Sequence, residues 1–274
     1  MEFKAFKMDG LGNDFVIIDK RKKTLNLSKK DIIKITDRNF VGCDQLIYIN
    51  RSDKFDAELE FFNPDGGSSA ACGNGTRCVA YFLSKEEKKN DISVKTEAGL
   101  LKSQILDNNI VTTNIGVAKF SWKEIPLSKE LDNKNLKIKI LDNNKKELVG
   151  GYALSVGNPH LIFFVENCES FNLNKIGPEL ENHSYFPKKC NVTLAQILNR
   201  KLIKVKVWER GAGLTKACGT AACATIVAGV KMNFVDKAAD VEFQHGRISI
   251  NIDKKDKINM KGKVSEIKEI NIKI

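Results

Sequence analysis

The sequence has 274 residues and a mass of 30.6 kDa, enough to bury a large core without disulfide or metal support. Hydrophobic residues make up 42% and charged residues 29% of the chain, a composition that excludes intrinsically disordered and collagen-like proteins. No stretch approaches the roughly 20 apolar residues of a membrane span, and residues 1–7 lack the apolar segment of a secretory signal. We therefore expect a cytoplasmic protein that does not bind membranes.

The net charge of +11 comes from 45 Lys and Arg residues against 34 Asp and Glu residues. Such a balance fits either a nucleic acid or an anionic small molecule as partner. Only seven of the cations are Arg, and the lysines are spread over the whole chain. Nucleic-acid-binding modules concentrate their charge and rely on Arg to read bases. We interpret the lysines as a solvated surface and predict no nucleic-acid partner.

The first half of the chain has the pattern of strands joined by short helices. Apolar runs and alternation predict strands at 15–18, 46–49, 57–62 and from 92 to about 117. Ser28 and Asp31 have the spacing of a capping box, which predicts that a helix begins there. The turn residues of 63–67 end the third strand. A second helix is predicted to begin near Gly73.

The second half repeats this pattern. Strands are predicted at 152–156, 161–165, 202–208 and from 238 to 274. Gly157-Asn158-Pro159 interrupts the first pair, and residues 209–213 form a loop after the third strand. A helix is predicted from about Gly219 to Lys231.

Two cysteine-containing phrases also repeat, 146 residues apart: Ala71-Cys72-Gly73-Asn74-Gly75-Thr76-Arg77-Cys78 and Ala217-Cys218-Gly219-Thr220-Ala221-Ala222-Cys223. This separation is close to half the chain length. A duplicated α+β unit, with a boundary near residue 118, is the simplest interpretation.

The chain has seven cysteines and no secretory context, so we do not expect a disulfide framework. Zinc sites and redox pairs use Cys-x2-Cys spacing, whereas the gaps within the two phrases are five and four residues. We therefore predict no metal. Five cysteines are interpreted as small buried side chains: Cys43, Cys78, Cys168, Cys190 and Cys223.

Cys72 and Cys218 differ from the other cysteines because each directly precedes a glycine where a turn enters a helix. The first N–H groups of a helix lack internal partners, and the helix dipole is positive there. This position is expected to lower the pKa of a thiol below its usual value of about 8.5, and the glycine lets a bound anion approach the backbone. Two such thiols facing each other would suit inversion of a stereocentre, since one removes a proton and the other returns one on the opposite face.

Five segments of the sequence together resemble the diaminopimelate epimerase family. They are Met8-Asp9-Gly10-Leu11-Gly12-Asn13-Asp14-Phe15, Phe62-Asn63-Pro64-Asp65-Gly66, the phrase 71–78, Gly157-Asn158-Pro159-His160, and residues 208–220 from Trp208 to Thr220. The resemblance departs from the family at Asp9, where His is usual, and at Gly67-Ser68, where Ser-Glu is common. The departure at Gly67-Ser68 affects the shape of the loop that contains these two residues.

The resemblance implies a cofactor-independent enzyme that interconverts LL- and meso-2,6-diaminopimelate in lysine and peptidoglycan biosynthesis. It implies two pseudo-symmetric β-rich lobes, each a curled mixed or antiparallel sheet around a central helix, with a cleft between them. The expected lobes are residues 1–118 and 119–263, and a strand at about 264–274 returns to the first lobe. We also expect a homodimer.

The family's site residues carry over onto matching positions of this chain. Cys72 and Cys218 match the two catalytic bases, and His160 and Glu209 match the polar pair that supports them. The reacting end of the substrate would be held by Asn13, Gln45, Gly73, Asn74, Gly219 and Thr220. The distal end would be held by Asn63, Asn158, Asn191, Glu209 and Arg210. A diamino diacid needs anion nests, acceptor oxygens and a bidentate arginine, and these residues supply them.

In the expected mechanism one cysteine is a thiolate and the other a thiol, and the two titrate as a coupled pair. Because the substrate's α-proton is a very weak acid, the closed site must exclude water and aim fixed dipoles at the carboxylate.

Three alternatives remain at this point. A relative of the proline racemases would keep the paired cysteines but bind one carboxylate, and such enzymes commonly have His where Asn74 stands. A nucleic-acid-binding protein would explain the charge but none of the five segments, and would give a salt-sensitive gel shift. A pyridoxal-dependent racemase would use Lys216 as its Schiff base and would be yellow.

Overall fold

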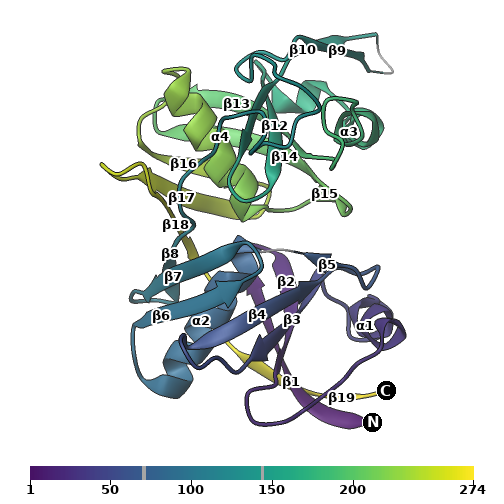
Figure 1. Ribbon diagram of the computed structural model, residues 1–274, viewed down its shortest axis with the longest axis vertical. Coiled ribbons are helices and arrows are strands. Elements are labelled where there is room, and N and C mark those ends of the chain that lie inside the picture. Colours follow the sequence, from purple (N-terminus) through teal and green to yellow (C-terminus); the bar gives the residue numbers. More distant parts are fainter. Residues whose placement is uncertain (70–71, 143–144) are drawn as a thin grey trace. The chain divides into compact units, whose positions relative to one another are not determined.

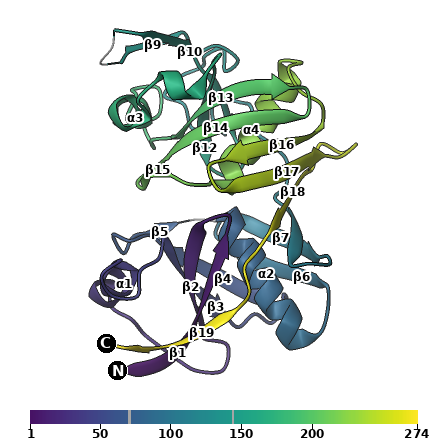
Figure 2. The same cartoon turned by 180° about the vertical axis from the view of Figure 1, so that it is seen from behind.

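The computed structural model describes residues 1–69, 72–142 and 145–274. Ala71, the first residue of the first cysteine phrase, lies outside the described residues. The contacts divide the chain into two compact units, residues 1–114 with 261–274 and residues 115–260 (Figures 1 and 2). Within the described ranges, no helix has both the length and the apolar character that a membrane crossing requires.

Unit 1 contains two helices among short strands. Its elements are β1 (Glu2–Gly10), β2 (Asn13–Asp19), α1 (Lys29–Thr36), β3 (Gln45–Asn50), β4 (Ala57–Phe62), β5 (Ser68–Ser69), α2 (Gly73–Glu87), β6 (Asp91–Thr96), β7 (Gly99–Ile105), β8 (Ile110–Asn114) and β19 (Lys268–Lys273). Ser28 caps α1, and the reciprocal bonds between Ser28 and Asp31 form the predicted capping box.

Unit 2 has a similar composition. Its elements are β9 (Ile138–Leu141), β10 (Glu147–Gly150), β11 (Tyr152–Ser155), β12 (Pro159–Phe164), the 3₁₀ turn η1 (Cys168–Ser170), α3 (Leu173–Glu181), β13 (Asn191–Asn199), β14 (Leu202–Glu209), β15 (Gly213–Thr215), α4 (Gly219–Lys231), β16 (Ala238–Phe243) and β17 (Gly246–Ile252). One further strand, β18 (Ile258–Lys263), crosses the boundary between the units. Pro159, expected to interrupt the chain, is instead the first residue of β12, a position where a strand tolerates proline.

Both units repeat one order of strand pairing. In unit 1, β1 and β2 are antiparallel, β2 and β3 parallel, β3 and β4 antiparallel, β4 and β6 parallel, and β6 and β7 antiparallel. In unit 2 the same sequence of directions joins β11, β12, β13, β14, β16 and β17. Helices α1 and α3 connect the first parallel pair of their units, and α2 and α4 connect the second. The predicted duplication therefore extends to the topology.

A nearly fully buried helix lies within the sheet of each unit. In α2 all residues from 73 to 84 are buried, and the helix contacts β1, β2, β6, β7 and β8 (Figure 1). In α4 the residues from 221 to 229 are buried, and the helix contacts β11, β12, β13, β16 and β17. The almost entirely apolar α4 requires such an environment, and α2 buries the polar Asn74, Thr76 and Arg77 as well. The first turn of each helix is therefore held rigidly by the surrounding sheet.

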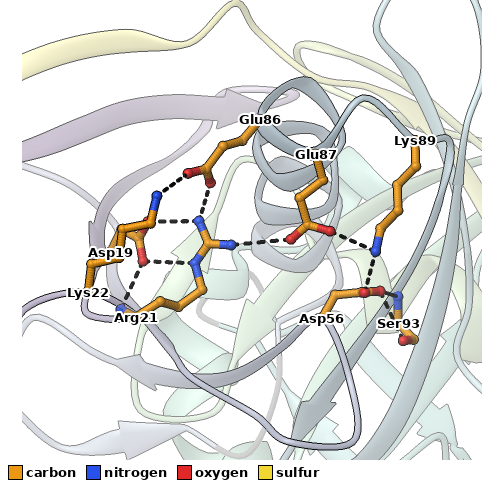
Figure 3. A network of polar contacts seen from close by, with 8 residues as sticks. All are labelled: Asp19, Arg21, Lys22, Asp56, Glu86, Glu87, Lys89 and Ser93. Atoms are coloured by element: carbon orange, nitrogen blue, oxygen red, sulfur yellow. Dashed lines mark hydrogen bonds and ion pairs between the residues drawn. The ribbon is translucent and has the colours of Figure 1, made fainter.

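The end of α2 opposite to Cys72 is held by a network of ion pairs (Figure 3). Arg21 binds Asp19 through two hydrogen bonds of 2.9 and 2.8 Å, and it also contacts Glu86 and Glu87. Two acidic residues at a helix C-terminus are unfavourable for the helix dipole. The Arg21 guanidinium compensates for them and ties α2 to the chain after β2.

We expect Arg21→Met to lower the free energy of unfolding by about 1.5–3 kcal/mol at neutral pH, the scale of a charge-assisted hydrogen bond. Burial alone would raise the pKa of Asp19, but the hydrogen bonds and charge of Arg21 outweigh it and lower that pKa. Because the folded-state pKa is lowered, the stabilisation is present above the ordinary carboxyl pKa and is lost as the pH falls through the folded value.

Urea unfolding of wild type and variant between pH 7 and pH 3 checks this expectation. Arg51→Met is the matched control, since Arg51 is exposed and its ion pair with Asp53 is exposed too. A stability difference between wild type and Arg21→Met that stays constant over this pH range would contradict the account.

Candidate active site

Cys72 occupies the N-cap of α2. Its backbone is extended, with φ −140°, and its carbonyl accepts the first helical hydrogen bond from Thr76 at 2.8 Å. The thiol sulfur accepts a hydrogen bond from the backbone N–H of Gly75 at 3.4 Å. The sulfur therefore lies beside the unpaired N–H groups at the positive end of the helix, as the sequence predicts.

Asn13 and Asn74 lie next to this thiol. The Oδ1 atom of Asn13 is 3.9 Å from Sγ of Cys72 and accepts a hydrogen bond of 3.3 Å from Nδ2 of Asn74. Nδ2 of Asn13 donates to Asp44 at 2.8 Å, and Oδ1 of Asn74 accepts from Arg77 at 2.9 Å. These four contacts determine the orientation of both amides, so that the side-chain carbonyl oxygen of Asn13 faces the sulfur.

Gln45 and Asn63 form a second pair in unit 1. Gln45 begins β3 beside β2, and Asn63 directly follows β4. Nε2 of Gln45 donates to Oδ1 of Asn63 at 2.9 Å. Within the described part of the chain, Oε1 of Gln45 is buried and has no hydrogen-bond partner. An unsatisfied buried acceptor is costly, so this oxygen is suited to receive a donor from a ligand.

Cys218 occupies the equivalent N-cap, that of α4, again with an extended backbone at φ −136°. Its sulfur lies 3.4 Å from Oγ1 of Thr220. Thr220 accepts a 3.3 Å hydrogen bond from Nδ2 of Asn158, whose Oδ1 is 3.0 Å from Nε2 of His160. The structure thus brings four predicted site residues of unit 2 into one connected group, with Gly219 buried in the first turn beside them.

His160 is fully buried. Burial and the nearby charge of Arg210 lower the pKa of His160 to about 3. The ring is therefore neutral at physiological pH and acts as a hydrogen-bonding group rather than as a proton donor of imidazolium type.

The Cys218 thiol has a raised pKa, contrary to the lowering expected at a helix N-terminus. Complete burial has the largest effect, and the charge of Glu209 and a hydrogen bond to its carboxylate raise the pKa further. Thr220 and the N–H of Ala221 oppose this shift but are weaker. Cys218 is therefore a protonated thiol beside a carboxylate at neutral pH.

Asn191 and Arg210 lie on neighbouring segments of the same unit. Oδ1 of Asn191 accepts from the backbone N–H of Arg210 at 3.0 Å, and Nδ2 donates to the carbonyl of Pro159 at 3.0 Å. The Arg210 guanidinium donates one hydrogen bond, of 3.1 Å, to the carbonyl of Lys188. The charge of Arg210 also lowers the pKa of His160. The predicted distal-end residues of unit 2 are thus close to the Cys218 group.

A family model described as diaminopimelate epimerase matches residues 5–121 and 152–267. The chain belongs to the diaminopimelate epimerase family. A diaminopimelate epimerase of Pelagibacter ubique is 62% identical over 274 residues, with all of both chains aligned. One of Rhodospirillum centenum is 39% identical, and the alignment covers 90% of this chain and 84% of the relative. Membership confirms the predicted family and makes the chain an isomerase.

Solved structures share the fold at low identity. A predicted epimerase of Pseudomonas aeruginosa has a TM-score of 0.72 at 13% identity and covers 98% of this chain and 99% of its own. A PhzF-family phenazine biosynthesis protein of Bacillus anthracis has a TM-score of 0.71 at 17% identity, with both chains fully covered. These similarities confirm the predicted fold class of this chain.

The side chains of Asp44 and Arg77 bind the predicted site residues Asn13 and Asn74 but were not predicted from the sequence. Glu181, which binds the residues flanking Glu209 and Arg210, was not predicted either. Asp44 directly precedes Gln45, and Arg77 is three residues beyond Asn74, so proximity to site residues was the available signal for both. No sequence signal marks Glu181.

Lys216, weighed above as a Schiff-base lysine, is exposed, which does not suit a pyridoxal lysine.

The raised pKa of Cys218 predicts unequal reactivity of the two N-cap thiols in this epimerase. At pH 7 iodoacetamide should modify Cys72 before Cys218, because the thiolate is the nucleophile and Cys218 is 4% exposed, whereas Cys72 is partly exposed. Modification of Cys218 should accelerate as the pH rises above 9. Peptide mass mapping over time gives both rates, and faster labelling of Cys218 at pH 7 would refute the prediction.

Proposed function

We propose that this chain interconverts LL- and meso-2,6-diaminopimelate by a two-base mechanism that needs no cofactor. The observation that carries the proposal is the duplicated placement of Cys72 and Cys218, each at the N-cap of a buried helix in units of equal topology. Membership of the diaminopimelate epimerase family supports the substrate.

In the proposed reaction one sulfur removes the α-proton and the other returns a proton to the opposite face. The C–H bond breaks as an S–H bond forms, and the electron pair passes into the substrate carboxylate. The second thiol then gives up its proton to the α-carbon. The raised pKa of Cys218 favours Cys72 as the base and Cys218 as the acid in one direction, with the roles exchanged in the other.

The carbanionic intermediate requires donors aimed at the reacting carboxylate. The N–H groups in the first turns of α2 and α4, at Gly73, Asn74, Gly219 and Thr220, are suited to this role because helix N-termini favour anions. Asn13 and Gln45 would complete the contacts to the reacting end. These donors are held by buried helices, so little reorganisation is needed during the reaction.

The distal amino-acid end would be bound by Asn63, Asn158, Asn191, Glu209 and Arg210. Arg210 supplies a fork for the carboxylate, and the amide and carboxylate oxygens accept from the ammonium group. Glu209 would have a second role, because its carboxylate contacts Cys218 and can support proton movement at that sulfur. His160, neutral and buried, would orient Asn158.

The expected lobes, residues 1–118 with 264–274 and residues 119–263, are proposed to close on the substrate and exclude water. We further propose that the enzyme is a cytoplasmic homodimer that binds no nucleic acid. Sedimentation of the purified chain, with and without a DNA duplex at low salt, tests the dimer and the absence of nucleic-acid binding together.

Proton exchange at the α-carbon tests the proposed function directly. Purified enzyme in heavy water, with LL-diaminopimelate and no added cofactor, should incorporate deuterium at the α-carbon and produce the meso isomer. Mass spectrometry measures the exchange, and chiral chromatography separates the isomers. Exchange only with proline, or only after addition of pyridoxal phosphate, would overturn the proposal.

A further inference from the structure

The last residue of α3 contacts both sides of the segment that carries Glu209 and Arg210. We propose that Glu181 is a positioning residue that fixes this segment for catalysis, an inference that rests on the proposed function. Glu181 is not among the residues predicted to bind the substrate. It acts through the residues on either side of the pair.

The two carboxylate oxygens of Glu181 accept hydrogen bonds from two different parts of this segment. Oε2 accepts from the indole Nε1–H of Trp208 at 2.7 Å, and Oε1 accepts from the backbone N–H of Gly211 at 3.0 Å. Trp208 precedes Glu209, and Gly211 follows Arg210. One side chain thus binds the chain immediately before and immediately after the proposed site pair.

Helix stability does not explain a glutamate at this position. Glu181 is 6% exposed, and burying a carboxylate is costly unless it is hydrogen-bonded. It is also the last residue of α3, where the helix dipole disfavours negative charge. Lys189 lies 3.7 Å away but is largely exposed, so its contribution is small. The hydrogen bonds from Trp208 and Gly211 therefore offset the cost of burying the Glu181 carboxylate.

The Trp208 ring is fixed by a second feature of α3. A Cβ atom built at Gly177 would lie 2.5 to 2.8 Å from ring atoms of Trp208, so the indole packs directly on the helix backbone there. Gly177 and Glu181 are four residues apart and therefore share one face of α3. The same face provides a flat contact for the ring and an acceptor for its N–H.

This arrangement has a direct consequence for the proposed site. Glu209 contacts Cys218, and Arg210 is held additionally by its backbone bond to Asn191. Without Glu181, the segment keeps its strand pairing with β13 and β15 and the bonds of Arg210 to Asn191 and Lys188, but it loses the two bonds that flank the Glu209–Arg210 pair. Both the carboxylate beside Cys218 and the guanidinium would then be less well oriented.

Glu181→Gln is the sharpest test, because glutamine has the same shape but offers one acceptor atom where two donors converge. Its amide nitrogen must face either the indole N–H or the Gly211 N–H. We expect kcat/KM for LL-diaminopimelate to fall tenfold or more, with KM raised as well as kcat lowered. Glu179→Gln, an exposed position two residues earlier on α3, is the matched control and should stay within twofold of wild type.

Fluorescence of Trp208 gives a readout that does not depend on activity. The chain has only two tryptophans, Trp122 and Trp208, so Trp122→Phe leaves Trp208 as the sole indole. In that background Glu181→Gln should shift the emission maximum, and Glu179→Gln should not. Gly177→Ala, which displaces the ring but keeps the carboxylate, should also shift the emission and raise KM.

Three outcomes discriminate among the explanations. A raised KM together with shifted Trp208 emission supports the positioning role. Unchanged KM and emission, with only a lower melting temperature, overturns it in favour of a purely structural role. If wild-type enzyme exchanges no α-proton, the proposed function fails, while an emission shift in Glu181→Gln would still support the contact with Trp208.

Discussion

Alanine at Cys72 or at Cys218 should lower kcat for epimerisation by at least about a thousandfold, the scale of a lost general base or acid. Each variant keeps one N-cap position intact and loses one of the two sulfurs. Because inversion needs a proton removed from one face and delivered to the other, the remaining thiol cannot complete the reaction in either direction. Deuterium incorporation into LL- and meso-diaminopimelate, measured separately, reports each half of the reaction.

The two helices supply their own control variants. Cys78 lies on α2 and Cys223 on α4, both fully buried and away from the helix N-termini. Alanine at either position should cost some stability through the small cavity but leave kcat within a few-fold of wild type. Wild-type turnover in Cys72→Ala or Cys218→Ala would remove the basis of the two-base mechanism.

Replacing Arg210 should mainly weaken substrate binding. The guanidinium donates one hydrogen bond to Lys188, and no other described acceptor binds its remaining donors. A bidentate contact to a carboxylate consists of two charge-assisted bonds, each worth about 1.5–3 kcal/mol. Arg210→Met should therefore lower kcat/KM by about a hundredfold or more, chiefly through KM, and Arg210→Lys should recover part of the loss.

Lysine provides the matched substrate, because it is diaminopimelate without the distal carboxylate. Wild type should prefer diaminopimelate strongly, whereas Arg210→Met should show a much smaller preference. Arg200→Met is the control variant, since Arg200 is an exposed residue paired with Asp236 in the same unit. An undiminished preference in Arg210→Met would show that another group binds the distal carboxylate.

Much of the fold could be predicted because its strands and helices have strong local signals. The alternation at 57–62 coincides with β4, and the apolar stretch after Cys218 coincides with α4. Helix α3 was missed because Gly177 and Pro178 lie in its middle, and both residues normally argue against a helix. β13 was missed as well, because its burial depends on pairing with β12 and β14, which no local pattern shows.

The site was predictable where the backbone determines the chemistry. A cysteine followed by glycine at the start of a helix led to the correct N-cap position for both thiols. The pKa direction at Cys218 was wrong because it depends on complete burial and on Glu209, whose proximity is a tertiary feature. The role of Glu181 could not be predicted either, because it depends on tertiary contacts of α3 and that helix was not predicted. Groups that support a site from another element are the hardest to find from sequence.

The pairing of β1 with β19 has a consequence for synthesis of the protein. Residues 2–7 pair with residues 268–273, and the backbone of Met1 bonds to that of Ile274. On the ribosome, β1 emerges long before β19 and must wait for it, whereas β11 to β17 find their pairing partners within unit 2. We expect unit 2 to fold first, leaving this edge of β1 open to a folding chaperone until β19 has been synthesised.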